Sequence, residues 1–561
     1  MDTINTQRSH RNLGPVIHND DVMRDAKSQR INRGQPGDGY HHFAGLFSAR
    51  KGLDAETLEN LCHLLQDKLA SSAPEAGFLN APQSNGPLKS RGIPAGYTYL
   101  FQLAAHDVVQ TSIPAKPFGA PAQRPRNLRR EPLEMETILG GGPISCPHAF
   151  DLAAPGAAKL RLGYVRKDAS FPLTWIPPAR DLPRISFQPD GLPDPRDGLE
   201  TVLVADDRND DNLLLSQLTV FFHGLYNYLV CAIDAQESMT ATQAEDTARR
   251  ILIRVYRRIL RHDLLARILH PDIYTLYLNQ KIRLDTLSAE GSTSLEFAFA
   301  AGRLGHSMVR DMYRLNARSG GDQSLETAIR TSSRHAPKWV PIEHGDIVDW
   351  DMFFEPENGR VPDGFNWALR FGPQVVGTMT TPLAAASPEG TKFFVRETHG
   401  TVFRDLTREA SGAMIKVSDL VEHALTTQPA SAWGTALDNV ISNEKRRKIV
   451  ETGLARLESK VTNTSHVHLN KTQREAILSD PPLSLFMMFE ADQLGHGGAT
   501  LGPVGSLVIG EAMWPAFYPK DWESPHHDLA KLEAALLGCL PETMPQLIGA
   551  LKTRALDIFA T

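Results

Sequence analysis

Apolar residues recur every three or four positions in several long stretches of the chain, which is the spacing of one buried face of an α-helix. Residues 54–70, DAETLENLCHLLQDKLA, follow this spacing through five leucines, and Asp54 is a suitable N-terminal cap. A longer apolar pattern covers about residues 209–234. These stretches predict helices, the second of them long and buried.

Further helices are predicted toward the C-terminal half. One covers about residues 243–268, where Thr242 and Glu245 form a candidate capping box. Another covers about residues 294–315, and the chain ends in two helical segments, LAKLEAALLGCL and MPQLIGALKTRAL. Strands do not alternate with helices, no glycine fingerprint follows a strand, and no repeat has a fixed period. The predicted fold class is therefore mainly α, with long loops and few short strands.

Polar and loop-forming residues divide the chain into an arm and one large domain. Residues 1–40 are rich in Asn, Arg, Asp and Gly, which predicts a polar N-terminal arm. Residues 113–200 contain many prolines and glycines, which predicts loops with short ordered pieces. We therefore expect a single large helical domain over residues 41–561.

The composition is that of an ordinary globular protein and argues against several classes of function. Of the 561 residues, 41% are hydrophobic and 22% are charged, so a large core can form. The net charge is −6, from 59 basic and 65 acidic residues, which gives no positive field for nucleic acid. The four cysteines are too far apart for a zinc knuckle or a redox pair, and they do not imply disulfides.

The first thirty residues lack the apolar core of a signal peptide. No apolar run approaches the length of a transmembrane helix. We therefore expect a cytoplasmic protein without a transmembrane segment. Export by a route that needs no leader stays an alternative.

Candidate chemistry begins with His106 and Asp107 at the end of the apolar segment LFQLAAHDVVQTS. Gln102 lies four residues before His106, one helical turn away and on the same face. Taken alone, this segment is more often a helix end, with Asp107 capping a turn and His106 satisfied in the core.

Three more segments carry paired polar residues. Arg208 precedes the long apolar pattern in DDRNDDNLLLSQ, and Arg303 and His306 stand three apart in FAAGRLGHS. Asp405 and Arg408 have the same spacing in FRDLTR. Each has an ordinary structural explanation: an ion pair in an acidic loop, a core histidine, or a pair on one helix face.

Together, and in this order, the segments resemble the haem peroxidase superfamily of the animal type, including its bacterial, peroxidase-like branch. The resemblance extends from about residue 43 to about residue 517. It rests on IPAGYTYLFQLAAHD, KLRLG, DDRNDDNLLLSQ, FAAGRLGHS, FRDLTR and EADQLGHGGATLGPVGSLVIGEAMW. It implies a haem-dependent enzyme that reduces hydrogen peroxide through a ferryl intermediate and oxidises small phenolic or aromatic donors, or iodide or bromide.

The resemblance also implies roles for the residues around the haem. His106 would be the distal base and Arg208 the distal cation, with Gln102 beside them, because cleavage of a peroxide bond needs a proton carrier and a positive charge. His306 would be the axial ligand of a haem b. Asp405 stands where the family has an asparagine beside that ligand.

Two further arginines and one acid complete the implied haem site. Arg303 and Arg408 match positions that face the haem propionates. The family can attach haem through ester bonds, but one of the two positions is Ala105 here, and the other is Asp211, which is shorter than the usual glutamate. We therefore expect haem that is not covalently attached.

A calcium site is the second cofactor site that the resemblance implies. Its first ligand in the family follows the distal histidine and corresponds to Asp107. The accompanying loop reads LEMETILGGGP, with Glu134 and Glu136 in place of shorter acids. Calcium accepts oxygen ligands in flexible geometry. We therefore expect that calcium can bind here, through side chains that are longer than those of the family.

Three alternatives to a peroxidase follow from the same residues. A fatty-acid dioxygenase of this superfamily would need a tyrosine three residues before the proximal histidine, where this chain has Arg303, and Tyr313 lies downstream. A haem-binding protein without catalysis would have no need to retain His106, Arg208 and His306 together. Thiolate ligation by Cys146 is the third alternative and rests on a single Cys-Pro dipeptide.

Overall fold

The computed structural model describes residues 40–41, 53–54, 56–61 and most of the span 92–554. Almost all of the predicted arm at 1–40, and residues 62–70 of the first predicted helix, lie outside the described residues. Within the span 92–554 the residues that are not described are 113–125, 130, 154–155, 164, 166–180, 188–198, 236–238, 280–292, 317–320, 332–341, 381–400, 412–413, 429, 460–468 and 518–526.

Helices form most of the described structure, which confirms the predicted mainly α class. The helices of at least eight residues are α3 Gly96–Val108, α6 Leu213–Asp234, α7 Ala241–Ile259, α9 Pro271–Leu278, η8 Ala301–Met308, α13 Thr401–Ser411, α14 Val417–Thr427, α16 Asn443–Ser459, α17 Lys471–Ser479, α18 Leu483–Leu494, α19 Pro503–Met513, α20 His527–Leu537 and α21 Met544–Arg554.

Shorter helices connect these elements. They are α4 Glu136–Leu139, α5 Gly142–Ser145, η4 Pro147–Ala149, η6 Asp207–Asp210, the π turn η7 Leu260–Leu264, α8 Leu265–Ile268, α10 Leu295–Phe299, α11 Leu325–Arg330, η9 His344–Asp346, η10 Trp350–Met352, α12 Gly377–Thr380, α15 Ala430–Trp433 and η11 Trp514–Phe517.

The described strands are short and pair only two by two. β1 Tyr40–His41 runs parallel to β8 Thr293–Ser294, and the other pairs are antiparallel. These are β2 Thr111–Ser112 with β3 Arg126–Asn127, β4 Phe150–Asp151 with β5 Lys159–Leu160, β6 Arg184–Phe187 with β7 Leu199–Val202, and β9 Met312–Tyr313 with β10 Gln323–Ser324.

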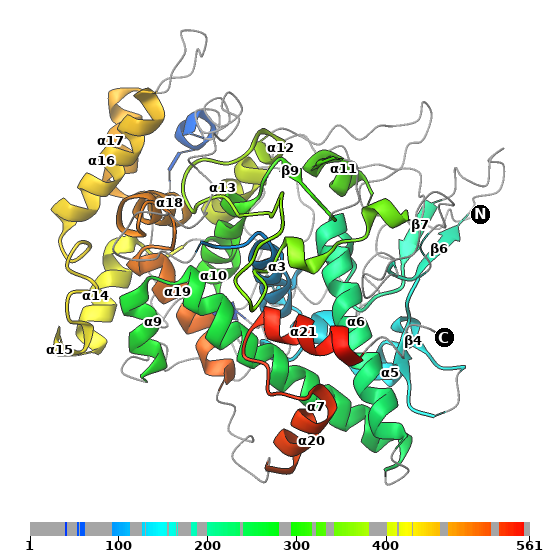
Figure 1. Cartoon of the computed structure of the whole chain (residues 1–561). Helices are drawn as coiled ribbons and strands as arrows, with labels where there is room; N and C mark the ends of the chain where they lie inside the picture. Colours follow the sequence, from blue (N-terminus) through cyan, green and yellow to red (C-terminus); the bar gives the residue numbers. More distant parts are fainter. Residues whose placement is uncertain are drawn as a thin grey trace, which may run out of the picture.

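Helix α6 lies at the centre of the core, as its apolar sequence predicts. Among the described helices it is the one whose length and composition would allow it to cross a membrane, so the expectation that no apolar run approaches that length is wrong. Its apolar window is wholly buried inside the protein. α6 packs against α3 and α7, and Figure 1 shows α3 near the middle of the molecule, between α10 and α6.

Helix α7 begins at Ala241, two residues before its predicted start, and its cap is Thr240 and not Thr242. The capping box is formed by Thr240 and Gln243, whose side chains satisfy each other's backbone amides, and not by Thr242 and Glu245. Both pairs have the spacing that a capping box needs. Glu245 instead accepts a hydrogen bond from the amide of Ala158, 2.6 Å away, so a tertiary contact decides between the two pairs.

The predicted helix over 294–315 is also corrected by the structure. Here α10 ends at Phe299, Ala300 leaves the helical conformation, and the chain continues as the 3₁₀-helix η8 and then strand β9. A 3₁₀-helix has three residues per turn, so Arg303 and His306 lie above one another. The chain therefore presents them from one edge of a tight turn.

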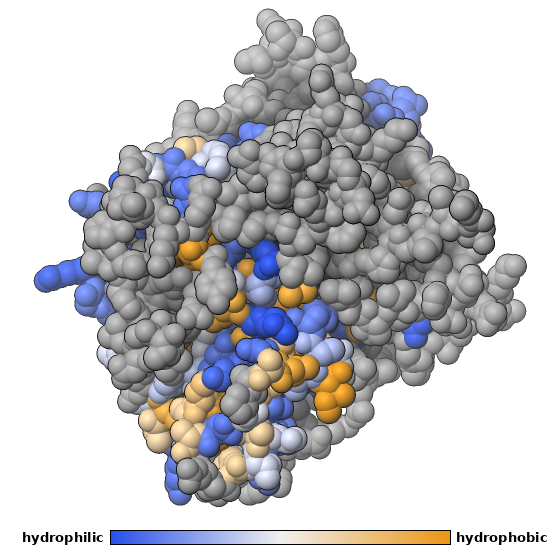
Figure 2. All heavy atoms as spheres, turned by 90° about the vertical axis from the view of Figure 1, so that its right-hand side faces the viewer, coloured by the Kyte–Doolittle hydropathy of each residue, from blue (hydrophilic) through white to orange (hydrophobic). Residues whose placement is uncertain are grey.

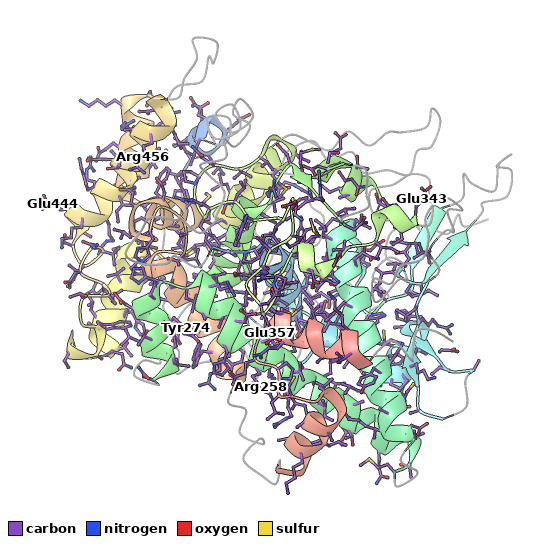
Figure 3. All side chains as sticks on the ribbon, viewed as in Figure 1. Arg258, Tyr274, Glu343, Glu357, Glu444 and Arg456 are labelled. Carbon is purple, nitrogen blue, oxygen red and sulfur yellow. The ribbon has the colours of Figure 1, made fainter. Side chains whose placement is uncertain are left out.

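The C-terminal helices are held to the domain by buried ion pairs. On α20, Glu533 is buried and lies 2.6 Å from Arg258 of α7, which Figure 3 labels at this junction. The Tyr228 hydroxyl donates to the carbonyl of Leu536 at 2.6 Å. Elsewhere on the surface, the described residues of the face in Figure 2 mix hydrophilic and hydrophobic side chains.

Candidate active site

Six of the sequence-predicted residues line one cavity between α3, η6, α10 and η8. They come from three segments that are far apart in the chain, α3, η6 with the residue after it, and η8. The cavity is lined by Gln102, His106, Arg208, Asp211, Arg303 and His306, together with Thr98, Phe101, Ala105, Val109, Phe297, Ala298, Gly302, Gly305 and Val309. The structure thus places two histidines, from α3 and η8, on the same hollow.

The two helices that carry these histidines approach each other closely at Gly305. A Cβ atom at this position would lie 2.9 Å from the Phe101 ring on α3. That distance is shorter than real Cβ contacts allow, so only glycine permits the approach. Gly305 therefore helps to set the spacing between the α3 and η8 sides of the cavity.

His306 is oriented by a carboxylate from a distant helix. Its Nδ1 lies 2.6 Å from Oδ2 of Asp405, which is buried on α13. The imidazole therefore uses Nδ1 toward the protein, and its Nε2 has no partner among the described residues. A neutral imidazole with one nitrogen held by a carboxylate and the other directed to a cavity is a suitable ligand for haem iron.

Helix α13 is itself held in place one turn beyond Asp405. The carboxylate of Glu409 accepts hydrogen bonds from the Leu483 and Ser484 amides at the N-terminus of α18. The positive end of a helix dipole favours such an anion. The contact ties α13 to α18 and so limits the freedom of Asp405.

The two predicted propionate partners stand differently in the structure. Arg303 lines the cavity, and its Nε donates to the carbonyl of Ala298 at 3.1 Å. Arg408 lies on α13, but its side chain is outside the described part of the structure. The role of both residues stays a prediction.

On the α3 side of the cavity, His106 is half-buried. Burial, with the nearby Arg208 cation as the second cause, lowers the pKa of His106 to about 3. Asp206 and Asp211 oppose this shift only in part. At neutral pH the imidazole therefore carries an unprotonated nitrogen, which a general base requires.

The guanidinium of Arg208 is fixed by four hydrogen bonds. Its Nε and Nη2 donate to Asp206, at 2.9 and 2.6 Å, and its Nη2 and Nη1 donate to the carbonyls of His106 and Val109. Burial disfavours the charge, but Asp206 outweighs it and raises the pKa of Arg208. Of the five N–H donors, one on Nη1 has no partner among the described residues.

Gln102 and Asp211 complete the polar lining of the cavity. The Gln102 side-chain oxygen lies 3.4 Å from Nδ2 of Asn212, which also caps α6. Asp211 follows η6 directly. Both residues are thus carried by well-ordered elements next to His106.

Two of the predicted calcium ligands, Asp107 and Glu134, already have partners within the protein. Asp107 is fully buried, and its two oxygens accept the amides of Met135 and Thr137 at 2.8 and 3.0 Å. Glu134 forms an ion pair with Arg257 at 2.5 Å, and Glu136 begins α4. Burial raises the pKa of Asp107 to about 6, against the opposing Arg129 charge.

The calcium prediction is therefore not supported by the arrangement of these residues. Across the described ranges no three His, Cys, Asp or Glu residues form a group that could hold a metal. The loop around Glu134 is held by Arg257 and by Asp107, which accepts the amides of Met135 and Thr137. The carboxylates of Asp107 and Glu134 already have partners within the protein, so they do not fit a calcium ion.

We expect thermal unfolding to be insensitive to calcium. If calcium were bound and present at a thousand times its dissociation constant, it would add about 4 kcal/mol to the free energy of unfolding. That increase would raise the melting temperature by several degrees. Calorimetry with calcium in excess and then with a chelator measures this shift. A melting temperature that rises with calcium would restore the predicted site.

Several residues of the site were missed at the level of sequence. Asn209 contacts His106 and Thr137, and Arg129 donates to the His106 carbonyl and to Asp206. Asn209 and Asp206 stand inside the segment DDRNDD, next to Arg208, which was the available signal. Thr137 and Arg129 come from loops whose position depends on the fold.

Cys146 does not take part in this cavity. It is buried near η4, with its Sγ 3.4 Å from Nε2 of His148, and burial raises the pKa of the thiol to about 11. A protonated, buried thiol is a poor metal ligand. The thiolate alternative has no support in the described residues.

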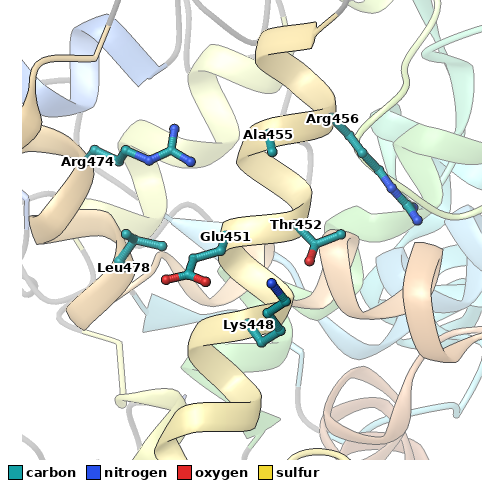
Figure 4. A pocket seen from close by; sticks show the side chains of 7 residues that line it. All are labelled: Lys448, Glu451, Thr452, Ala455, Arg456, Arg474 and Leu478. Atoms are coloured by element: carbon teal, nitrogen blue, oxygen red, sulfur yellow. The ribbon is translucent and has the colours of Figure 1, made fainter.

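A second hollow lies between α16 and α17 (Figure 4) and is lined by Lys448, Glu451, Thr452, Ala455, Arg456, Arg474 and Leu478. Its arginines are paired with carboxylates, Arg474 with Glu458 and Arg456 with Asp492. No histidine lines it. It is an open, charged groove and offers no ligand for haem.

Comparison with known proteins identifies the class of fold that carries this cavity. Residues 173–354, about a third of the chain, match the animal haem peroxidase family. That segment includes Arg208 and His306, whereas His106 precedes it and Asp405 follows it. No curated protein is significantly similar to the chain in sequence.

Solved structures with a similar fold include a peroxidase and dioxygenases. Peroxidase A from Dictyostelium discoideum superposes with a TM-score of 0.55 at 11% identity, over 94% of this chain and 93% of that one. The fatty acid alpha-dioxygenase of Oryza sativa gives 0.50 at 12% identity, over 95% and 85%. That of Arabidopsis thaliana gives 0.50 at 11% identity, over 96% and 85%. At such identities the likeness concerns the fold alone.

Proposed function

We propose that the chain is a haem-dependent peroxidase that reduces hydrogen peroxide and oxidises small organic donors, since residues 173–354 match the animal haem peroxidase family. One observation carries the proposal. A single cavity holds both His306, oriented by Asp405, and a neutral His106 beside Arg208.

The donor set of the cavity fits a haem b. His306 would bind the iron through Nε2, and Arg303 lies beside it on the same edge of η8, where a guanidinium suits a propionate. When bound, the haem supplies the electrons that break the O–O bond of the peroxide. The protein supplies the proton transfers and the charge that this step requires.

His106 carries out the proton transfers. Its free Nε2 accepts the proton of the oxygen that binds and then returns it to the oxygen that leaves. The remaining N–H of Arg208 is available to stabilise the charge on the leaving oxygen. Because Arg208 is fixed to Asp206 and to two carbonyls, this donor needs little reorganisation.

Asp405 adjusts the strength of the axial ligand. A carboxylate that shares the Nδ1 proton of His306 makes the imidazole more electron-donating than the neutral amide of an asparagine would. This favours the ferric iron over the ferrous iron. The substitution thus supports a peroxidase, which works from the ferric state.

The position three residues before His306 favours a peroxidase over a fatty-acid dioxygenase. It holds Arg303, where a dioxygenase of this superfamily needs a tyrosine. Tyr313 does not replace it, because its ring packs on Tyr99 and Phe353 and does not line the cavity. Its hydroxyl accepts a hydrogen bond from the Arg310 amide at 2.7 Å.

Phenolic and other aromatic compounds are the proposed donors, since they give up single electrons at an exposed haem edge without a tailored site. Iodide or bromide could be oxidised beside Gln102. Chloride is not proposed, because in the family its oxidation depends on covalent links to haem, one of which Ala105 cannot form.

The test is a titration of the protein with haem, followed by assays with two substrate pairs. We expect one haem per chain, turnover of hydrogen peroxide with a phenol, and no oxygen uptake with a long-chain fatty acid. Oxygen uptake with the fatty acid would favour the dioxygenase. Haem binding without either activity would favour a silent haem-binding protein.

We expect the haem to be extractable with acid acetone. Ala105 offers no oxygen for an ester bond, and the Asp211 side chain is one methylene shorter than the glutamate that forms the other bond. Mass analysis of the extract and of the polypeptide measures the distribution. Haem that stays on the polypeptide would show that Asp211 reaches the macrocycle.

A further inference from the structure

A buried asparagine stands behind the histidine that faces the cavity. Oδ1 of Asn209, which is fully buried on η6, lies 3.2 Å from Nδ1 of His106. Neither residue is close to the other in sequence, and the contact is made where η6 crosses the end of α3. The Nε2 atom of His106 is the ring nitrogen left for the cavity.

The orientation of the Asn209 amide is determined by a third residue. Its Nδ2 lies 2.8 Å from the backbone carbonyl of Thr137, which can only accept a hydrogen bond. The Thr137 hydroxyl lies 3.1 Å from Oδ1 of Asn209. The amide nitrogen must therefore face the carbonyl, and Oδ1 must face His106.

An amide oxygen can only accept, so Nδ1 of His106 must carry the proton. The neutral ring then has its lone pair on Nε2, toward the cavity. A free histidine in water favours the opposite tautomer, with the proton on Nε2. In that tautomer, the Nε2–H group of His106 would donate a hydrogen bond toward the peroxide, whereas the reaction needs an atom that accepts a proton.

We propose that Asn209 is a positioning residue that, with Thr137, holds His106 in the Nδ1–H tautomer and so directs its basic nitrogen at the substrate. That this nitrogen faces a substrate rests on the proposed function. The tautomer itself is a property of the protein and can be measured without any reaction.

The backbone of His106 is fixed as well, which prevents the ring from turning away. Nε of Arg129 donates to the His106 carbonyl at 2.9 Å, and Nη2 of Arg208 donates to the same oxygen at 3.0 Å. Both guanidinium groups also bind Asp206. The ring plane and the main chain are thus held by separate contacts.

The charged groups around the ring do not select a tautomer by themselves. They are Arg208, Asp206 and Asp211 from the η6 segment, Asp107 from α3 and Arg129 from the loop before α4. Their charges change the proton affinity of the ring as a whole, whereas Asn209 lies within hydrogen-bonding distance of one particular nitrogen. The choice between Nδ1–H and Nε2–H therefore depends on the amide.

Nuclear magnetic resonance of protein labelled with ¹⁵N-histidine reads the tautomer directly. At pH 7 we expect the His106 signals, identified by their absence from His106→Gln, to show a protonated Nδ1 and an unprotonated Nε2. The reverse pattern would overturn the inference even if the enzyme reduces peroxide. The measurement keeps its meaning even if peroxidase activity is absent.

Two substitutions separate positioning from folding. Asn209→Leu removes the acceptor, so the His106 signals should shift toward the Nε2–H tautomer, and the reaction with peroxide should slow about tenfold. Asn209→Asp keeps the acceptor but adds a charge that favours imidazolium. It should keep the Nδ1–H tautomer and move the acid limb of the pH profile upward.

Asn227→Asp is the matched control. Asn227 is also buried, and its amide accepts from and donates to the backbone of Leu160 at 2.7 and 2.8 Å, away from the cavity. Loss of stability alone should affect both aspartate variants, but only Asn209→Asp should move the pH profile. Equal profiles in the two variants, or an unchanged tautomer in Asn209→Leu, would reject the positioning role.

Discussion

Replacement of His306 with alanine is expected to remove the haem absorption band, or to leave a weakly bound, differently ligated haem. The imidazole is the proposed axial ligand, and the other histidine that lines the cavity, His106, is held on the α3 side by its contact with Asn209. The measurement is a haem titration followed by absorption and by equilibrium dialysis.

Substitution of Asp405, the hydrogen-bond partner of His306, should weaken haem binding without abolishing it. Asp405→Asn retains a hydrogen-bond acceptor for Nδ1 but not the charge, and the loss of such a partner typically costs about 10–100-fold in metal affinity or activity. Haem should therefore still bind, more weakly and with a shifted spectrum. His423→Ala, on α14 and outside the cavity lining, serves as the control.

Two results bear directly on the assignment of His306. An unchanged spectrum in His306→Ala would contradict it, because another group would then bind the iron. Rescue of the band by added imidazole would instead support the assignment, because the small molecule can occupy the space that the side chain leaves. The folded state of the variant is checked by its helical circular dichroism.

Loss of His106 should slow the first reaction with hydrogen peroxide by a factor on the order of 100 or more, which is the usual contribution of a general base. His106→Ala leaves the haem ligand His306 untouched, so haem binding should survive. Stopped-flow measurement of this step in both proteins gives the ratio. A variant that reacts at the wild-type rate would make His106 a structural histidine.

The pH dependence of that step has a definite sign. The base must be neutral, and the pKa of His106 is lowered to about 3 by burial and by Arg208. The rate should therefore rise with pH through about 3 and stay flat across the neutral range. His106→Ala should lack this acid limb, and a limb near the ordinary value of about 6.5 would show that the imidazole is solvated.

Local patterns were enough to predict several of the long helices. The apolar face of α6 and the helical segments of α7, α20 and α21 follow from periodicity, because burial of one helix face needs only residues close in sequence. Periodicity was wrong at residues 294–315. There the close contact at Gly305 and the break at Ala300 divide one apparent helix into three elements.

The sequence by itself determined the types and the order of the residues that meet at the cavity. Gln102 with His106, and Arg303 with His306, are spaced so that a helical turn brings each pair to one face. Such short-range geometry needs no tertiary information. Spacing along the chain gives no partner for a polar residue whose contacts lie in a distant segment.

Only the tertiary structure decided which group each of these side chains contacts. Asp405 reaches His306 across 99 positions and Asn209 reaches His106 across 103, while Asp107 binds backbone amides and Glu134 binds an arginine. A buried polar group takes whichever partner the packing places within hydrogen-bond distance. That choice depends on how separate helices cross, which no local pattern contains.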